Sequence, residues 1–276
     1  MEKIHALLSP IDHASVAESV VQQIEDMILA GILSEGRRLP SEREMAETLA
    51  VSRPKLREAL KVLEDRGLLT VRHGEGSFIA PLTGKAMSQA LIQLYGRHGN
   101  AFFDYLEYRR VQECFAARIA AERATETDRQ IIRKYLAALE SDLNRGDVNA
   151  SREHDVKFHA AIVAASHNAT LIHMMSSIYD LTKQTVFYNR EYLRTIDGTG
   201  LLLHQQHTAI ADAVCSGNPE GASRAAAAHI DFVEQSMRIG MDKARRETIA
   251  AKRAALLADE FPDDPPPDPE DPAEAD

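Results

Sequence analysis

Four residues far apart in the sequence could together bind a metal ion: Asp155, His159, His207 and His229. Asp155 and His159 lie four residues apart in the segment 151–166, so on a helix both project from one face, one turn apart. His207 and His229 each lie in a stripe of otherwise apolar residues at helical spacing. Three imidazoles and a carboxylate thus point towards a core, where an unpaired polar group costs roughly a few kcal/mol. A divalent metal would satisfy all four.

The metal itself is less constrained than its ligands. A mixed set of nitrogen and oxygen ligands suits zinc, our first choice, and also manganese, nickel, cobalt or iron. The alternative for each histidine is a buried side chain that hydrogen-bonds to an ordinary neighbour. That interpretation suits any one of them alone, whereas the set with its Asp-x-x-x-His start favours a metal. His204 competes with His207, but it lies about 60° round the same helix in a more polar stripe, so we predict that it faces the rim.

Composition points to a helical protein of the cytoplasm. The chain has 276 residues, 44% of them hydrophobic, which is enough to bury a core, and it has no tryptophan. The two cysteines, Cys114 and Cys215, are too few for a disulfide framework and fit a reducing compartment. No stretch approaches the roughly 18 apolar residues of a membrane helix, and the N-terminus does not resemble a signal peptide. We therefore expect no membrane association.

The formal net charge of −10 is concentrated at the C-terminal end. Residues 259–276 include nine acidic residues and no basic one, so the rest of the chain has 33 of the 42 acidic residues against all 32 basic ones. From Phe261 onward this tail is also rich in proline, which excludes a helix or a packed core. We expect a disordered, solubilising tail.

The first eighty residues predict three helices and a hairpin. Apolar residues at four-residue spacing predict a helix within 15–33. Ser41 and Glu44 have the spacing of a capping box, which opens a short second helix. Ser52 is expected to cap a third helix, and the alternating segment 68–80 predicts a hairpin. This order is that of a winged helix-turn-helix.

The predicted third helix has the charge that a DNA-reading helix needs. Six basic and three acidic residues lie between Arg53 and Arg72. Arg53 and Arg57 are one turn apart near the N-terminus of the helix, the end that such helices insert into the major groove. There an arginine can bond guanine O6 and N7. The alternative is a solvated charged helix, but the complete pattern of three helices and a wing favours DNA binding.

Several segments resemble one family of bacterial transcription regulators, the GntR family. The DNA-binding half resembles its N-terminal domain in Leu39-Pro-Ser-Glu-Arg-Glu-Met-Ala, Val51-Ser-Arg-Pro-Lys-Leu-Arg-Glu-Ala-Leu, Leu63-Glu-Asp-Arg-Gly-Leu-Leu and His73-Gly-Glu-Gly-Ser-Phe-Ile. The second half is similar to the all-helical effector (FCD) domain of the FadR-like branch, in Tyr105-Leu-Glu-Tyr-Arg-Arg-Val-Gln-Glu, Asp155-Val-Lys-Phe-His, Ala165-Ser-His-Asn, His207-Thr-Ala-Ile and Ala228-His229. The resemblance covers about residues 15–240.

The resemblance implies a homodimer that binds operator DNA with two-fold symmetry and responds to a small carboxylate bound next to a metal. The positions that match DNA contacts are Arg43, Ser52, Arg53 and Arg57 on the central helices, and His73 and Gly74 at the wing tip. Asp155, His159, His207 and His229 match the metal ligands of the family. The family commonly has a glutamate before the third ligand, and Gln206 in its place predicts a weaker outer role for this position.

The effector implied by the resemblance is a 2-hydroxy or 2-oxo acid of the lactate, glycolate or pyruvate kind. Such an acid could chelate the metal through its carboxylate and the neighbouring oxygen. Arg109, on a helix with several aromatic residues, is the candidate for a second, bidentate contact with the carboxylate. The alternative for Arg109 is a structural ion pair with a neighbour such as Glu113.

These observations predict a mainly α protein: a winged helix-turn-helix domain over 11–80, an antiparallel all-α effector and dimerisation bundle over 86–257, and the acidic tail 259–276. Bundle helices are expected over 86–95, 103–124, 127–145, 149–166, 168–194, 199–216 and 219–257, with N-caps at Thr127, Asn149 and Asn168. We expect a regulator and no enzyme. Two alternatives remain: a metal-dependent hydrolase or lyase, and a DNA-binding protein whose metal is purely structural.

Overall fold

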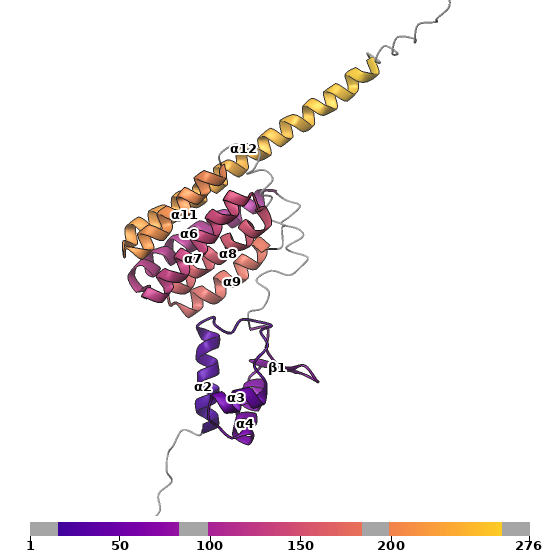
Figure 1. Cartoon of the computed structure of the whole chain (residues 1–276). Coiled ribbons are helices and arrows are strands. Elements are labelled where there is room, and N and C mark those ends of the chain that lie inside the picture. Colours follow the sequence, from indigo (N-terminus) through magenta and orange to yellow (C-terminus); the bar gives the residue numbers. More distant parts are fainter. Residues whose placement is uncertain (1–15, 83–98, 184–198, 261–276) are drawn as a thin grey trace, which may run out of the picture.

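The computed structural model describes residues 16–82, 99–183 and 199–260 (Figure 1). Within them the protein is mainly helical, with a small N-terminal helix-turn-helix unit and a C-terminal helical bundle, which confirms the predicted fold class. The predicted helix 86–95, the last part of the predicted helix 168–194 and most of the predicted acidic tail lie outside the described residues. None of the described helices is long and apolar enough to cross a membrane.

The N-terminal unit contains three helices and a two-stranded antiparallel wing. The helices are α2 (Val16–Leu29), α3 (Glu42–Thr48) and α4 (Arg53–Asp65), and the strands are β1 (Leu69–Arg72) and β2 (Gly76–Ile79). The register pairs Leu69 with Ile79 and Arg72 with Gly76. One face of each helix packs into a shared apolar core around Ile24, Leu56 and Leu63.

Local sequence explains where α3 and α4 begin. Ser41 and Glu44 form the predicted capping box, in which the Ser41 N–H donates to Glu44 Oε2 at 2.9 Å and the Glu44 N–H donates to Ser41 Oγ at 3.3 Å. Ser52 is the N-cap residue of α4 as predicted, but its side chain makes no capping hydrogen bond. Pro54 fits the first turn, where its missing N–H needs no partner.

The C-terminal bundle contains the helices α6 (Gly99–Arg123), α7 (Glu126–Arg145), α8 (Val148–Ala165), α9 (Ala169–Lys183), α11 (Thr199–Cys215) and α12 (Pro219–Glu260). Helix α8 packs against α6, α7 and α9, whereas α12 packs against α6 and α11. The second half of α12 extends beyond the other helices of the bundle (Figure 1). The core between α6, α8, α11 and α12 encloses the candidate metal ligands.

Two of the three predicted caps in the bundle were wrong by two residues. Helix α7 is capped by Thr125, which forms a capping box with Asp128, and α8 is capped by Asp147, whose side chain accepts from the Ala150 N–H at 3.0 Å. Thr125 and Asp147 lie upstream of the predicted caps, and each has its own side-chain acceptor. The helices start at these two residues because their side chains satisfy free N–H groups of the first turn. Asn168 does cap α9, since its Oδ1 accepts from the Leu171 N–H at 3.1 Å.

Candidate metal centre

Three helices bring the predicted metal ligands into the core of the bundle. Asp155 and His159 lie on α8, His207 on α11 and His229 on α12. All four are buried: Asp155 and His207 are 3% exposed, and His159 and His229 are 2% exposed. The helical spacing read from the sequence therefore assigned each of these side chains to the correct, inward face.

The three imidazoles converge on one point. One ring nitrogen from each of His159, His207 and His229 lies within 4.8 Å of the other two. The ring centroids of His207 and His229 are 4.5 Å apart, and those of His159 and His229 are 5.1 Å apart. Asp155 joins the group through His207, because its Oδ1 lies 3.3 Å from His207 Nε2. The structure thus brings all four predicted residues together.

The chemistry of this cluster fits a divalent metal. Among the described residues, the buried Nε2 of His159 has no hydrogen-bond partner. An unsatisfied buried nitrogen costs about 1–3 kcal/mol, which coordination would offset. Three imidazole nitrogens and one carboxylate oxygen form a set that zinc and its first-row neighbours accept. Asp155, His159, His207 and His229 would hold such an ion.

Two hydrogen bonds at the outer edge of the cluster orient the imidazoles. His159 Nδ1 lies 2.9 Å from Glu113 Oε2, and His229 Nδ1 lies 3.1 Å from Gln206 Oε1. When Nδ1 donates to such an acceptor, the lone pair is on Nε2, which faces the centre. Gln206, for which the sequence predicted a weak outer role, is thus within hydrogen-bonding distance of a candidate ligand. The sequence did not predict that Glu113 contacts His159.

Arg109 lies beside this cluster and is itself 2% exposed. Its Nε donates to Glu113 Oε1, which is the ion pair that the sequence left open as an alternative. Its Cζ lies 5.8 Å from the centre of the Tyr179 ring, and the Tyr179 hydroxyl donates to Glu113 Oε1 at 3.3 Å. The guanidinium is therefore anchored by Glu113 at the edge of the imidazole cluster.

The buried charges shift one another's protonation. Burial alone would raise the pKa of Glu113, but the positive charge of Arg109, followed by the contact with His159, outweighs burial and holds this pKa well below its ordinary value. Burial opposes the charged form of Arg109 too, yet Glu113 raises the pKa of the guanidinium. Burial, followed by repulsion from His207 and His159, lowers the pKa of His229 well below 6.5. A neutral His229 is the form that can coordinate a metal.

The unfolding free energy of the metal-free protein is expected to fall as the pH drops below 6.5, the ordinary pKa of histidine. The folded state resists protonation of His229, whereas the unfolded chain binds a proton at the ordinary pKa, so stability present above this pH is lost as the pH falls. Urea unfolding of metal-stripped protein between about pH 8 and about pH 5 measures the slope. A His229→Gln variant should show a shallower slope, and an unchanged slope would contradict this origin.

His204 lies outside the convergent group. It is half-buried, whereas His207, one turn further along α11, is buried and faces the other imidazoles. The Nδ1 of His204 is buried without a hydrogen-bond partner among the described residues. Its ring is thus less exposed than a rim position implies, although it is not among the three convergent histidines.

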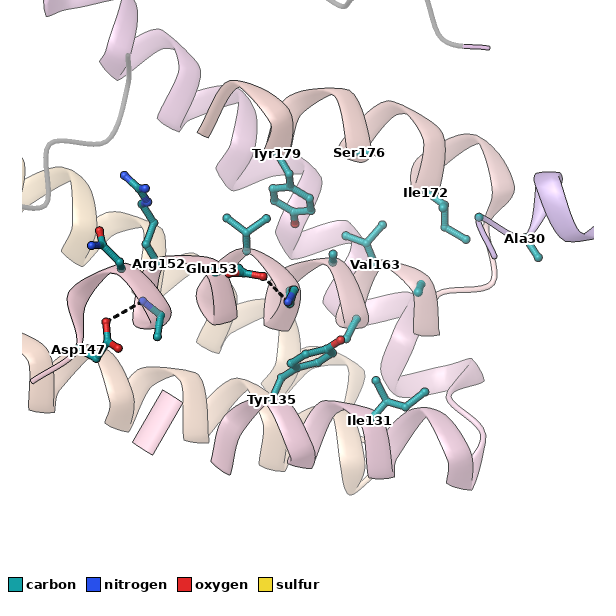
Figure 2. A pocket seen from close by; sticks show the side chains of 18 residues that line it. Ala30, Ile131, Tyr135, Asp147, Arg152, Glu153, Val163, Ile172, Ser176 and Tyr179 are labelled. Atoms are coloured by element: carbon teal, nitrogen blue, oxygen red, sulfur yellow. Dashed lines mark hydrogen bonds and ion pairs between the residues drawn. The ribbon is translucent and has the colours of Figure 1, made fainter. Parts of the chain in front are cut away.

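A groove on the bundle surface approaches the cluster from outside. It has a volume of about 1110 Å³ and follows α8 between α7 and α9, with Tyr135, Val163 and Tyr179 among the residues that line it (Figure 2). Val163 and Tyr179 also line a cavity of about 10 Å³ beside Glu113 and His159. These two side chains therefore stand between the groove and the imidazole cluster.

The predicted DNA-contacting residues lie on the surface of the N-terminal unit. Arg43 is on α3, Ser52, Arg53 and Arg57 are at the start of α4, and His73 and Gly74 form the turn of the wing; all six are exposed. Gly74 has φ +77°, a conformation that side chains disfavour, so glycine suits this tight turn. The Arg57 Nε donates to Glu42 Oε2 at 2.7 Å.

Comparison with known proteins identifies both halves of the chain. Residues 16–79 match the family described as bacterial regulatory proteins of the gntR family, and residues 104–232 match the FCD domain. The chain belongs to the GntR family. The putative L-lactate dehydrogenase operon regulatory protein of Escherichia coli (strain K12) is 34% identical over 239 residues, which cover 85% of this chain and 91% of that protein. The predicted GntR and FadR-like resemblance is thereby confirmed.

Two further relatives extend over most of the chain. The Glc operon transcriptional activator of Escherichia coli (strain K12) is 34% identical over 226 residues, 80% of this chain and 89% of the relative. The HTH-type transcriptional regulator LutR of Bacillus subtilis (strain 168) is 32% identical over 212 residues, 75% of this chain and 94% of the relative. The protein is a transcription regulator of the GntR type with an FCD domain, and regulators of this family bind operator DNA.

Proposed function

We propose that this regulator controls its operator affinity through a small carboxylate, a 2-hydroxy or 2-oxo acid, bound at a divalent metal in the helical domain. The observation that carries the proposal is the convergence of three buried imidazoles and Asp155 beside a buried arginine, in a chain that also has a DNA-binding domain. Zinc is the first choice of metal. We further propose the division into a DNA-binding domain (11–80), an effector and dimerisation domain (86–257) and an acidic tail (259–276).

The donor set leaves room for a ligand on the metal. One carboxylate and three imidazoles occupy four positions, so a five- or six-coordinate ion retains one or two, and a 2-hydroxy acid can fill both by chelation. Arg109 pairs with Glu113, which in turn contacts His159, so its guanidinium is a buried cation beside the cluster, and a guanidinium matches a carboxylate with two parallel hydrogen bonds. One relative is named for an L-lactate dehydrogenase operon, which supports this class of acid.

Control of DNA binding requires that the acid bind two states of the protein with different affinity. A tenfold change in operator affinity corresponds to about 1.4 kcal/mol of coupling between the two sites. In the proposed homodimer, that coupling would change how two DNA-binding domains fit an operator with two-fold symmetry.

Calorimetric titration of lactate, glycolate and pyruvate into metal-loaded and metal-stripped protein tests the proposal. We expect one of these acids to bind only when the metal is present, and a ligand at about 100 times its Kd to stabilise the fold by about 2.7 kcal/mol. Arg109→Ala should weaken this binding while metal content is unchanged. Equal binding with and without metal would exclude direct chelation, and binding unaffected by Arg109→Ala would leave Arg109 with the ion pair alone.

The deep burial of the ligand set also suits a structural metal, which is the second candidate. In that case metal would raise the melting temperature, but none of the acids would alter stability or operator affinity. Hydrolysis or lyase activity in a broad substrate screen with added metal would instead favour an enzyme.

A further inference from the structure

Glu113 on α6 links the candidate ligand His159 to Arg109. Its side chain is buried, with 4% of the residue exposed. Oε1 accepts from Arg109 Nε and, at 3.3 Å, from the Tyr179 hydroxyl, whereas Oε2 lies 2.9 Å from His159 Nδ1. One carboxylate thus contacts a guanidinium, a phenol and an imidazole from three different helices, α6, α9 and α8.

The pattern of donors shows that Glu113 is present as the carboxylate. A protonated carboxyl group must donate one hydrogen bond, whereas Arg109 and the Tyr179 hydroxyl both donate to Oε1, and the Nδ1 of His159 can donate to Oε2. The ionised form accepts all three, and hydrogen bonds to a charged group are stronger than those between neutral groups. Glu113 therefore contributes a full negative charge to a site from which water is largely excluded.

The charges around the imidazoles can be counted. Among the buried residues that the structure describes, Arg109 is positive and Glu113 and Asp155 are negative. Asp142, a further buried carboxylate among the described residues, is neutralised elsewhere by Arg145 Nη2 at 2.7 Å and contacts His154 Nδ1 at 2.6 Å. With neutral imidazoles the site has a net charge of minus one, which a divalent metal changes to plus one.

We propose, building on the proposed function, that Glu113 sets the charge of the ligand, so that the metal-loaded site selects an acid with one carboxylate over an acid with two. A single carboxylate neutralises the site, whereas a second would leave an unpaired negative charge in a buried position, and such a charge is costly unless it finds a partner. Glu113 and the three imidazoles are each 4% exposed or less, so a second carboxylate would lose its water shell among them. Glu113 is thus a specificity-determining residue that also positions His159 and Arg109.

The test compares three probes that share the same 2-hydroxy acid group: lactate, malate, and the 4-methyl ester of malate. The ester has nearly the size of malate but only one negative charge, so it separates charge from size. Calorimetric titration into zinc-loaded wild-type protein should show that the ester binds at least tenfold more tightly than malate. Equal affinity for malate and its ester would overturn the inference about Glu113 but not the proposed effector class. Absence of binding by all three probes would overturn the proposed effector class, and this inference with it.

The Glu113→Gln variant tests whether this residue is responsible. Removing its charge should reduce the preference for the ester over malate by tenfold or more, because the more positive site then accommodates the second carboxylate. Zinc affinity, measured by competition with a chelator, should fall about 10–100-fold, since His159 loses its charged partner. The control is Glu122→Gln, the same charge change at an exposed position of the same helix, which should leave both quantities unchanged. An unchanged preference in Glu113→Gln would contradict the proposal, and the wild-type comparison decides it if this variant does not fold.

Discussion

His207→Ala should reduce metal affinity by more than the roughly 10–100-fold that the loss of an outer hydrogen-bond partner costs, because it removes one of four direct ligands. His207 is central to the cluster: its ring is 4.5 Å from that of His229 and 5.2 Å from that of His159, and its Nε2 lies 3.3 Å from Asp155 Oδ1. Apart from His159 and His229, which are ligands themselves, no described histidine belongs to the convergent group and could replace His207. Elemental analysis of the purified protein, followed by competition with a chelator, measures the effect.

His204→Ala is the matched control, since it removes the same side chain from the same helix, one turn away. We expect metal content close to that of the wild type, and any effect of this variant to be a lower unfolding free energy. Full occupancy in His207→Ala together with loss in His204→Ala would show that the wrong histidine was chosen. Loss of folding in His207→Ala can be recognised by circular dichroism, and His207→Gln then provides a gentler removal of the ligand nitrogen.

Spacing along the sequence was sufficient to predict which residues converge. A helix repeats every 3.6 residues, so a polar residue in an apolar stripe is expected to point inwards, as His207 and His229 do, and the four-residue spacing places His159 on the same face as Asp155. The order of elements in the N-terminal unit followed from capping residues and turn residues in the same way. Both rest on interactions between residues a few positions apart, which a single sequence displays directly.

The outer partners could not be predicted, because they depend on how helices pack. Glu113 and His159 are 46 positions apart, and no periodicity within α6 or α8 shows that these two faces meet. Tyr179 was missed for the same reason, since its contact with Glu113 links α9 to α6. Arg109 and Glu113 lie one turn apart on a single helix, so their ion pair could be proposed as an alternative. The caps of α7 and α8 were misplaced because neighbouring residues have equivalent capping side chains.

Simultaneous replacement of Arg53 and Arg57 by alanine should abolish sequence-specific operator binding while fold and metal content are retained. Both side chains are exposed at the N-terminal end of α4, so their removal leaves the core around Leu56 and Leu63 intact. A bidentate contact between arginine and guanine contributes about 1–3 kcal/mol, so Arg57→Ala alone should weaken binding about tenfold or more. Fluorescence anisotropy with operator DNA and with unrelated DNA at fixed salt measures both the specific and the non-specific affinity.

The ion pair between Arg57 and Glu42 is compatible with base contacts by Arg57. Their side chains are 67% and 42% exposed, and an exposed pair of this kind contributes only about 0–1 kcal/mol, less than a bidentate base contact. Lys61→Ala is the control, because Lys61 is a basic, exposed residue of α4 two turns away from the N-terminal end and pairs with Asp65 at 2.7 Å. It should change affinity for operator and unrelated DNA alike, by a small factor, whereas the arginine variants should lower the ratio of the two. Unchanged operator affinity in a folded Arg53→Ala/Arg57→Ala protein would assign base reading to another element of the domain.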